Sequence, residues 1–325
     1  MTPEPPRLGG HPLLDLLQRR RETGSRNDGA QITLAIEGGG MRGVVCGGMV
    51  AALESLGLTH AFDEVIGCSA GAIAGAYFIA GQAAFGTRIF YEEINNRRFI
   101  DKRRLWLRRP VVSVDFLLDD VCRNAKRLDW QAVLDSETRL VCIAADIDRQ
   151  QAARLEGFED REALFAALKA SARIPGVAGP PVIIDGRRHV DGGVYENVPI
   201  VSARERGASH VVALMTRPRG VIPEGLELAE KLIVIPWLNR QQRGAGDDYR
   251  RQPGRYRNEL LFVRQAAEAP ERTVIAVAAE SSAAEVANIE TDTARLHQGA
   301  RDGFAAVYTA FGLEPPDPSG PLHLG

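Results

Sequence analysis

The run Val65-Ile66-Gly67-Cys68-Ser69-Ala70-Gly71-Ala72-Ile73-Ala74-Gly75 decides the fold of this chain. It starts as a short apolar strand, passes through Gly-x-Ser-x-Gly and continues into small residues typical of a tightly packed helix. In such a sharp turn, a Cβ at Gly67 or Gly71 would collide with the backbone beside it. Ser69 would then lie at the apex, at a helix N-terminus, where its hydroxyl can act as a nucleophile. The other interpretation is an ordinary glycine-serine turn.

Length and composition indicate a globular protein with one large or two smaller domains. The 325 residues are 45% hydrophobic and 25% charged, and the formal net charge of −2 gives no general attraction for nucleic acid, so no such partner is expected. No apolar run reaches the roughly 18 residues of a membrane-spanning helix, and no signal core is present. The four cysteines lack metal-ligand spacing, which favours reduced thiols in a cytoplasmic protein. They are Cys46, Cys68, Cys122 and Cys142.

Apolar runs that alternate with helical patterns predict a central, mostly parallel sheet covered by helices. The expected strands cover residues 32–36, 63–68, 140–146, 211–215 and 273–279, with antiparallel arms at 150–155 and 182–190. The expected helices cover residues 45–57, 115–124, 161–173, 200–206 and 292–311.

Composition divides the chain into four segments. Residues 1–30 are expected to be a flexible arm with a short helix, and residues 31–216 carry the α/β pattern. Residues 217–313 have a weaker pattern and are expected to pack on the same domain. Within them, the arginine-rich stretch 240–257 indicates a mobile loop or a solvated helix face. Residues 314–325, rich in proline and glycine, are expected to form a flexible tail.

A second glycine motif follows the first expected strand. Gly38, Gly39 and Gly40 leave a strand and enter a helix, so their backbone N–H groups can face one oxygen, as an oxyanion hole requires. Arg42 can attract an anionic head group or pin the loop. The same loop also fits the dinucleotide fingerprint, for which Asp63 would be the ribose-binding acid, although Asp63 precedes its strand.

A base is needed to accept the proton of Ser69. A triad with histidine would draw on a histidine after Ser69, but none lies in a glycine-flanked loop. Those histidines are His189, His210, His297 and His323. Asp191 follows an apolar hairpin arm and precedes two glycines; a buried carboxylate there can act as base, although a simple Asp-Gly-Gly turn is the other interpretation.

Three motifs together resemble the signatures of the patatin-like phospholipase family. They are Glu37-Gly38-Gly39-Gly40-Met41-Arg42-Gly43, Gly67-Cys68-Ser69-Ala70-Gly71 and Asp191-Gly192-Gly193, in that order. The similarity runs from about Ile32 to Met215, and residues 170–176 also look like the segment that precedes the family's aspartate. Many members have Asp where this chain has Glu37.

The resemblance implies a three-layer α/β/α patatin-like fold and a Ser-Asp dyad that works without histidine, metal or cofactor. It implies that Ser69 is the nucleophile and Asp191 the base, with Gly38, Gly39 and Gly40 as the oxyanion loop. The expected activity is hydrolysis of lipid carboxylic esters, as in a phospholipase A. Two alternatives stay open: an α/β-hydrolase-type esterase with a Ser-Asp-His triad, and a catalytically silent lipid- or nucleotide-binding module.

A basic and aromatic stretch suits a lipid substrate. Arginines near a lipid surface attract anionic head groups, while Trp106 and Phe99 could insert at the interface. The residues expected to make peripheral contact with an anionic membrane are Arg97, Arg98, Arg103, Arg104, Trp106, Arg108 and Arg109. A lid, a solvated loop or a docking face for the C-terminal part are the other interpretations.

Overall fold

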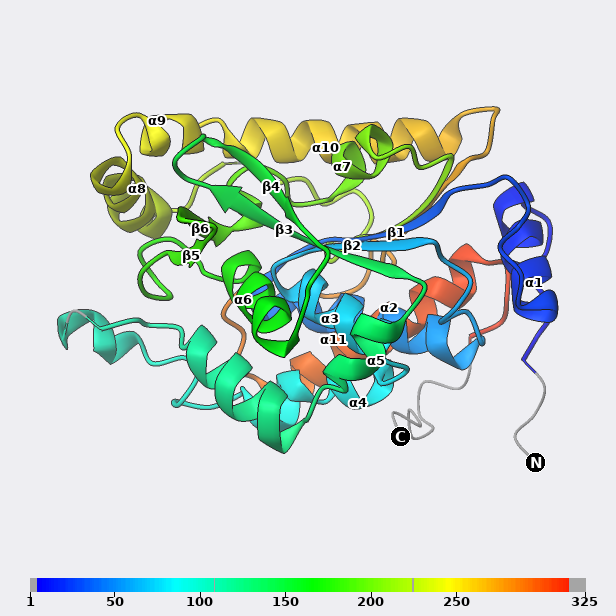
Figure 1. The fold of residues 1–325 in the computed structure, drawn as a ribbon, viewed down its shortest axis with the longest axis horizontal. Helices are drawn as coiled ribbons and strands as arrows, with labels where there is room; N and C mark the ends of the chain where they lie inside the picture. Colours follow the sequence, from blue (N-terminus) through cyan, green and yellow to red (C-terminus); the bar gives the residue numbers. More distant parts are fainter. Residues whose placement is uncertain (1–4, 108, 224, 316–325) are drawn as a thin grey trace.

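A mixed eight-stranded sheet forms the centre of the computed structural model, which describes residues 5–107, 109–223 and 225–315 (Figure 1). The strand order is β5-β6-β3-β2-β1-β7-β8, and β4 pairs with β3. β1, β2, β3, β7 and β8 run parallel, whereas β4 and β6 are antiparallel to β3. The strands are β1 Ile32–Ile36, β2 Glu64–Cys68, β3 Arg139–Asp146, β4 Gln151–Leu155, β5 Val182–Ile184, β6 Arg187–Asp191, β7 His210–Leu214 and β8 Val274–Val277.

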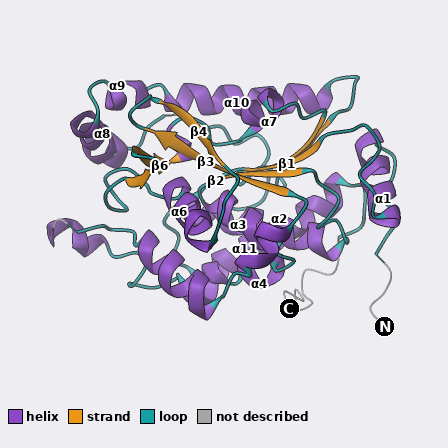
Figure 2. Ribbon diagram, in the orientation of Figure 1, coloured by secondary structure: helices purple, strands orange, loops and turns teal. Residues whose placement is uncertain are grey.

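Helices cover both faces of this sheet, which confirms the predicted three-layer α/β/α fold (Figure 2). α10 (Gln252–Glu268) and α7 (Ile200–Glu205) lie along one face, and α2 (Val44–Ser55), α3 (Ala70–Ile79) and α11 (Thr293–Ala310) lie along the other. Alternate residues of β1 enter the two cores: Leu34 and Ile36 join one, and Ala35 joins the other with Val263 of α10.

Eleven α-helices occur in the described ranges: α1 Pro12–Thr23, α2 Val44–Ser55, α3 Ala70–Ile79, α4 Ala83–Thr87, α5 Trp130–Asp135, α6 Arg161–Ser171, α7 Ile200–Glu205, α8 Ile235–Gln241, α9 Ala245–Tyr249, α10 Gln252–Glu268 and α11 Thr293–Ala310. Shorter 3₁₀ and π segments are η1 Gly40–Gly43, η2 Ile89–Glu93, η3 Lys102–Leu107, η4 Phe116–Ala125, η5 Gly192–Val194 and η6 Glu230–Val234. None of these helices combines the length and the apolar character needed to cross a bilayer.

The C-terminal part shares the core of the α/β region. β8 extends the sheet beside β7, and α11 packs against α2 so closely that a Cβ on Gly48 would lie 2.0 Å from the carbonyl oxygen of Ala300. The stretch 240–257 forms α9 and the start of α10 and is therefore not a loop. Arg250, Arg251 and Arg257 are exposed, as predicted for a solvated helix face, but Tyr256 is buried.

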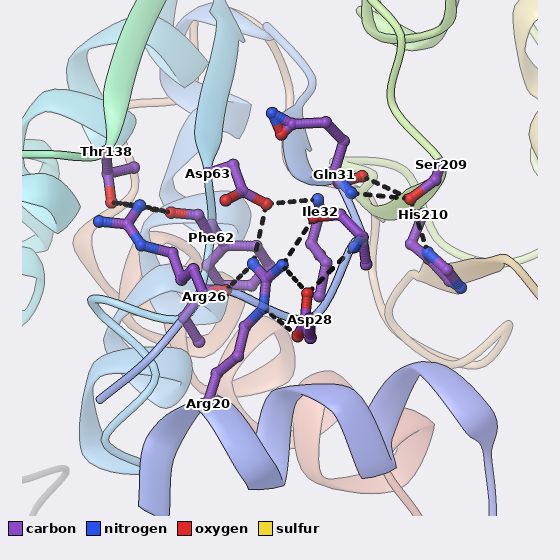
Figure 3. Close-up of polar contacts among 12 residues, drawn as sticks. Arg20, Arg26, Asp28, Gln31, Ile32, Phe62, Asp63, Thr138, Ser209 and His210 are labelled. Atoms are coloured by element: carbon purple, nitrogen blue, oxygen red, sulfur yellow. Dashed lines mark hydrogen bonds and ion pairs between the residues drawn. The ribbon is translucent and has the colours of Figure 1, made fainter. Parts of the chain in front are cut away.

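Helix α1 packs on the domain, so the described part of the segment expected to be a flexible arm is ordered on the core. Its leucines Leu13, Leu14 and Leu17 are buried. The buried guanidinium of Arg20 lies 2.8 Å from both Asp28 and Asp63 and ties the helix to the amino-terminal end of β2 (Figure 3). Such a fully paired buried cation fixes the position of the helix.

Candidate active site

Ser69 sits at the predicted sharp turn between β2 and α3. Its backbone is in the left-handed region, with φ 53° and ψ −121°, a strained conformation for a residue with a side chain. A Cβ on Gly67 would lie 2.5 Å from the backbone nitrogen of Ala72, and one on Gly71 would lie 2.5 Å from the carbonyl oxygen of Ile36. The predicted steric need for both glycines is confirmed.

The side chains of Ser69 and Asp191 meet. The Ser69 hydroxyl donates a hydrogen bond to Oδ2 of Asp191 over 2.7 Å. The register of β3 explains the meeting: Cys68 pairs with Ile143, and Asp191 pairs with the next residue, Ala144. Because β4 occupies the other edge of β3 at these positions, β2 and β6 follow each other along the same edge. Ser69, which follows the end of β2, therefore lies next to Asp191 at the end of β6.

The segment that precedes β5 braces both residues. The Ser171 hydroxyl accepts a hydrogen bond from the backbone N–H of Ser69 (2.8 Å) and donates one to the carbonyl oxygen of Ile143 (2.6 Å). The backbone N–H of Asp191 donates to the carbonyl oxygen of Arg173 (2.9 Å). Ser171 is fully buried, so these contacts hold the turn and the end of β6 in fixed positions.

The Asp191 carboxyl group has a proton affinity suited to a general base. Desolvation raises its pKa to about 6, against the opposing effect of hydrogen bonds from Ser69 and from the backbone N–H of Gly193, the latter 2.9 Å long. Above that pH the group is an anion that can take a proton from a hydroxyl in contact with it.

The three loop glycines have different surroundings. The N–H of Gly38 donates to the carbonyl oxygen of Asn197 over 3.3 Å, whereas the N–H groups of Gly39 and Gly40 have no protein acceptor among the described residues. A Cβ on Gly38 would lie 3.1 Å from the Cβ of Ser69, so the loop passes directly beside the turn. Gly39 and Gly40 are therefore the available donors.

Arg42 is engaged by the protein itself. It is buried, its Nε donates to the hydroxyl of Thr216 over 3.0 Å, and its guanidinium lies 3.6 Å from the Glu285 carboxylate. The backbone N–H of Thr216 in turn donates to Glu37 over 2.6 Å. These contacts favour the loop-pinning interpretation of Arg42, although the residue still borders the cavity described next.

An apolar cavity of about 580 Å³ opens over Ser69 and Asp191. Its volume is typical of a site for a small organic molecule. The wall residues include Val50, Ile73, Ile89, Phe90, Leu117 and Val234. The loop glycines border the same cavity, so the hydroxyl, the carboxylate and the available amides face one apolar space.

The described histidines lie elsewhere. The Nδ1 of His189 lies 3.1 Å from the carbonyl oxygen of Arg187, and the ring of His297 lies against the Tyr91 ring with centroids 4.0 Å apart. His210 lies beside Ser209, near the amino-terminal ends of the strands (Figure 3). None of these three has a hydrogen bond to the serine-aspartate pair; the fourth candidate, His323, falls outside the described ranges.

Asp63 does not fit a ribose site. It lies at the amino-terminal end of β2, opposite the glycine loop, and its carboxylate accepts hydrogen bonds from Arg20 and from the backbone N–H of Ile32. The dinucleotide interpretation thus lacks its acid. In residues 5–107, 109–223 and 225–315, no group of three or more His, Cys, Asp or Glu side chains is arranged to hold a metal ion.

The basic and aromatic segment projects from the body of the molecule as η3 and its flanks, drawn in cyan-green in Figure 1. The Trp106 side chain is 88% exposed, but Phe99 is buried, so the prediction that Phe99 inserts at an interface is wrong. Arg97, Arg98, Arg103 and Arg109 are exposed, whereas Arg104 is half-buried and donates to the carbonyl oxygens of residues 97 and 98. Arg108 lies outside the described residues.

A family model described as "Patatin-like phospholipase" matches residues 34–204, which is more than half of the chain. The chain belongs to the patatin-like phospholipase family. The matched range contains Ser69, Asp191 and the glycine loop. Membership in this patatin-like family supports activity as a lipid ester hydrolase.

Curated proteins and a solved structure are also similar to this chain. The Escherichia coli (strain K12) protein YjjU is 24% identical over 67% of this chain and 58% of its own length. "Lysophospholipase NTE1" of Cryptococcus neoformans is 27% identical over 57% of this chain but only 11% of its own. The chain thus spans little more than half of one curated relative and a small part of the other. The crystal structure of VipD from Legionella pneumophila shares the fold, with a TM-score of 0.50 and 12% sequence identity. The match covers 87% of this chain and 67% of the VipD chain.

Several residues around the patatin-like site were missed by sequence reasoning. Asn197 contacts Gly38 and Gly193, and Glu259 and Tyr256 reach the site from α10. Asn197 follows the Asp-Gly-Gly motif closely, which is a usable signal. The spacing of Tyr256, Glu259 and Val263 on one helix face was obscured by the arginines on either side of Tyr256.

Proposed function

We propose that this protein is a serine acyl hydrolase that cleaves lipid carboxylic esters, as a phospholipase A or lipid acyl hydrolase. The observation that carries the proposal is the 2.7 Å hydrogen bond from the Ser69 hydroxyl to Asp191 at the base of an apolar cavity of about 580 Å³. Family membership and the printed name of the fungal relative, a lysophospholipase, support an ester of a fatty acid as substrate.

Acylation begins when Asp191 takes the hydroxyl proton of Ser69. The Ser69 oxygen forms a bond to the ester carbonyl carbon, and the carbonyl π electrons move to its oxygen to give a tetrahedral oxyanion. As the intermediate collapses, the bond to the alcohol oxygen breaks and Asp191 returns the proton to that oxygen. The alcohol leaves, and the fatty acyl group remains on Ser69.

Deacylation repeats the sequence with water. Asp191 takes a proton from the water, whose oxygen attacks the acyl carbon. The bond to Ser69 breaks, the serine oxygen regains a proton from Asp191, and the fatty acid is released. One carboxylate serves both steps, since its pKa of about 6 lets it accept and return a proton near neutrality.

The backbone N–H groups of Gly39 and Gly40 stabilise the oxyanion in this mechanism. They border the cavity beside Ser69 and have no acceptor among the described residues, whereas the N–H of Gly38 donates to the carbonyl oxygen of Asn197. The loss of one such donor typically costs about 3–4 kcal/mol of transition-state stabilisation. The positive end of the α3 dipole, which starts one residue after Ser69, also stabilises the negative charge of the oxyanion.

The catalytic unit comprises residues 31–216 in this proposal, with residues 217–313 packed on the same domain. Support comes from β8, which extends the sheet, and from Asn288, whose carbonyl oxygen accepts the N–H of Met41 over 3.0 Å at the end of the glycine loop. The C-terminal part therefore forms one wall of the site.

The exposed segment around η3 makes peripheral contact with an anionic membrane in this proposal. Trp106 and Leu107 are exposed at its tip, and Leu105 and Lys102 border the cavity, so the contact lies next to the entrance of the substrate site. Arginines beside an aromatic side chain are typical of interfacial binding. A lipid ester could then pass directly from the bilayer to Ser69.

Covalent labelling tests the proposal. A fluorophosphonate probe should label the wild-type protein and a Ser281→Ala variant, an exposed serine outside the site, but not Ser69→Ala. Without the probe, the wild type and Ser281→Ala should release fatty acid from phospholipids, lysophospholipids or acylglycerols, and Ser69→Ala should not. A folded wild-type protein that neither labels nor hydrolyses any of these lipids would contradict the proposal and leave a silent binding module.

A further inference from the structure

One face of α10, which lies outside the family-matched range, contacts the site in two places. One is the glycine loop, and the other is the turn after Asp191. Tyr256 and Glu259 lie three residues apart, so both point to the same side of the helix. Both are buried, with exposed fractions of 4% and 5%. Neither touches the serine or the aspartate, and neither has a role in the mechanism above.

Tyr256 reaches the half that carries the glycine loop. Its hydroxyl donates to Oε1 of Glu37, the residue directly before Gly38, while Oε2 of Glu37 accepts the backbone N–H of Thr216 over 2.6 Å. Glu37 is 1% exposed, so its carboxylate depends on these donors. The tyrosine thereby fixes the point at which the loop leaves β1.

Glu259 reaches the half that carries Asp191. Its Oε2 accepts the backbone N–H groups of Asn197 (3.0 Å) and Val198 (2.9 Å). Asn197 in turn accepts from the N–H of Gly38 through its carbonyl oxygen (3.3 Å) and donates from Nδ2 to the carbonyl oxygen of Gly193 (3.3 Å). The glycine loop and the turn after Asp191 thus meet at Asn197.

We propose that Tyr256 and Glu259 of α10 are positioning residues that hold the glycine loop and the turn after Asp191 in the geometry required for acyl transfer. The proposal rests on the proposed function. Misplacing catalytic groups by about 1 Å can cost roughly a hundredfold in rate, so two buried contacts at these points suffice to control turnover. Burial raises the pKa of Glu259 to about 8, so the carboxyl group is uncharged at neutral pH and accepts the two hydrogen bonds in its protonated form.

Four variants test the assignment: Tyr256→Phe, Glu259→Ala, Glu259→Gln and the exposed Asn258→Ala as the control on the same helix. Tyr256→Phe and Glu259→Ala should each lower kcat about 10–100-fold with KM on a soluble ester unchanged. Glu259→Gln keeps a neutral acceptor oxygen and should restore most of kcat. Asn258→Ala should match the wild type.

Amide hydrogen exchange gives a readout that does not need activity. Peptides covering residues 37–43 and 192–198 should exchange faster in Tyr256→Phe and Glu259→Ala than in Asn258→Ala, whereas the α1 peptide should stay unchanged in all of them. An inactive wild type with this exchange pattern would defeat the proposed function and, with it, a role in acyl transfer, and would leave α10 only as a restraint on the two loops. An active wild type whose Tyr256→Phe and Glu259→Ala variants match Asn258→Ala in kcat and exchange would overturn the positioning role. An equal loss in Glu259→Gln and Glu259→Ala would do the same.

Discussion

Ser69 and Asp191, 122 positions apart in the sequence, form a 2.7 Å hydrogen bond because their strands end on consecutive residues of β3. Ile143 pairs with the residue before Ser69, and Ala144 pairs with Asp191 itself. The geometry of the pair is therefore set by hydrogen bonds of a buried strand, which positions side chains more rigidly than a loop does.

Asp191→Asn should abolish turnover while leaving the protein folded. Removing a general base that also orients its nucleophile lowers kcat by roughly 10⁴-fold or more. The decisive measurement is kcat on a soluble ester alongside a thermal unfolding curve. A variant that keeps more than a tenth of the wild-type kcat would mean that another group takes the proton.

The same substitution should change the pH dependence of stability. The folded-state pKa of Asp191 is raised from 3.8 to about 6, so the fold prefers the protonated form, and wild type loses stability as pH rises from about 4 to 6. At pH 8, Asp191→Asn should be more stable than wild type by up to about 3 kcal/mol, and the difference should shrink at pH 4. Urea unfolding at both pH values measures this; an equal difference at both would refute the desolvation argument.

The pH dependence of catalysis should report the same carboxyl group. With Asp191 required as an anion, kcat/KM on a soluble ester should fall about tenfold per unit below pH 6 and level off above it. A soluble substrate avoids changes in membrane contact with pH. A midpoint near 4 would indicate a carboxylate that is not desolvated.

Gly40→Ala should disable the oxyanion loop. Gly40 has φ 57°, and a Cβ there would lie 2.6 Å from the carbonyl oxygen of Asn288, so the loop must shift. The expected loss is about 10²–10³-fold in kcat. Gly81→Ala is the matched control, since Gly81 has φ 65° but open space around it. Equal kcat in the two variants would argue against a role for this loop.

The histidines offer a test against a triad. His189→Gln, His210→Gln and His297→Gln should each keep kcat close to wild type, because none of these rings contacts Ser69 or Asp191; the same is expected of His323→Gln. A triad would instead lose at least about 10⁴-fold on removal of its histidine. One such loss in a folded variant would reinstate the triad.

Vesicle binding checks the membrane contact. Neutralising Arg103, Arg104, Arg108 and Arg109 together should weaken binding to anionic vesicles by at least about tenfold at low salt, because each basic side chain adds to the attraction. Trp106→Ala should weaken binding with less dependence on salt. Turnover of a soluble ester serves as control and should not change. Binding equal to wild type would remove this surface from the proposal.

The strands and the sharp turn at Ser69 followed from apolar runs and glycine spacing, since both signals are local. The pairing of Ser69 with Asp191 followed from the resemblance to the patatin-like family, because the two residues are far apart in the sequence. The hydrogen bond from the N–H of Gly38 to Asn197 could not be predicted, because the two residues are distant in the sequence and are brought together only by the folded sheet. Burial of Phe99 and the packing of α1 depended on contacts between distant segments. α10 was hardest to predict: Arg257 and Arg264 are exposed, whereas Tyr256 and Glu259 are buried by the site they border.

The match to the family model stops at residue 204, yet Thr216, Tyr256, Glu259 and Asn288 all contact the glycine loop or its supports. A gene trimmed to the family boundaries would encode the nucleophile and its base but not the scaffold that holds the loop beside them. Chimaeras and truncations of this protein should therefore retain residues through α11.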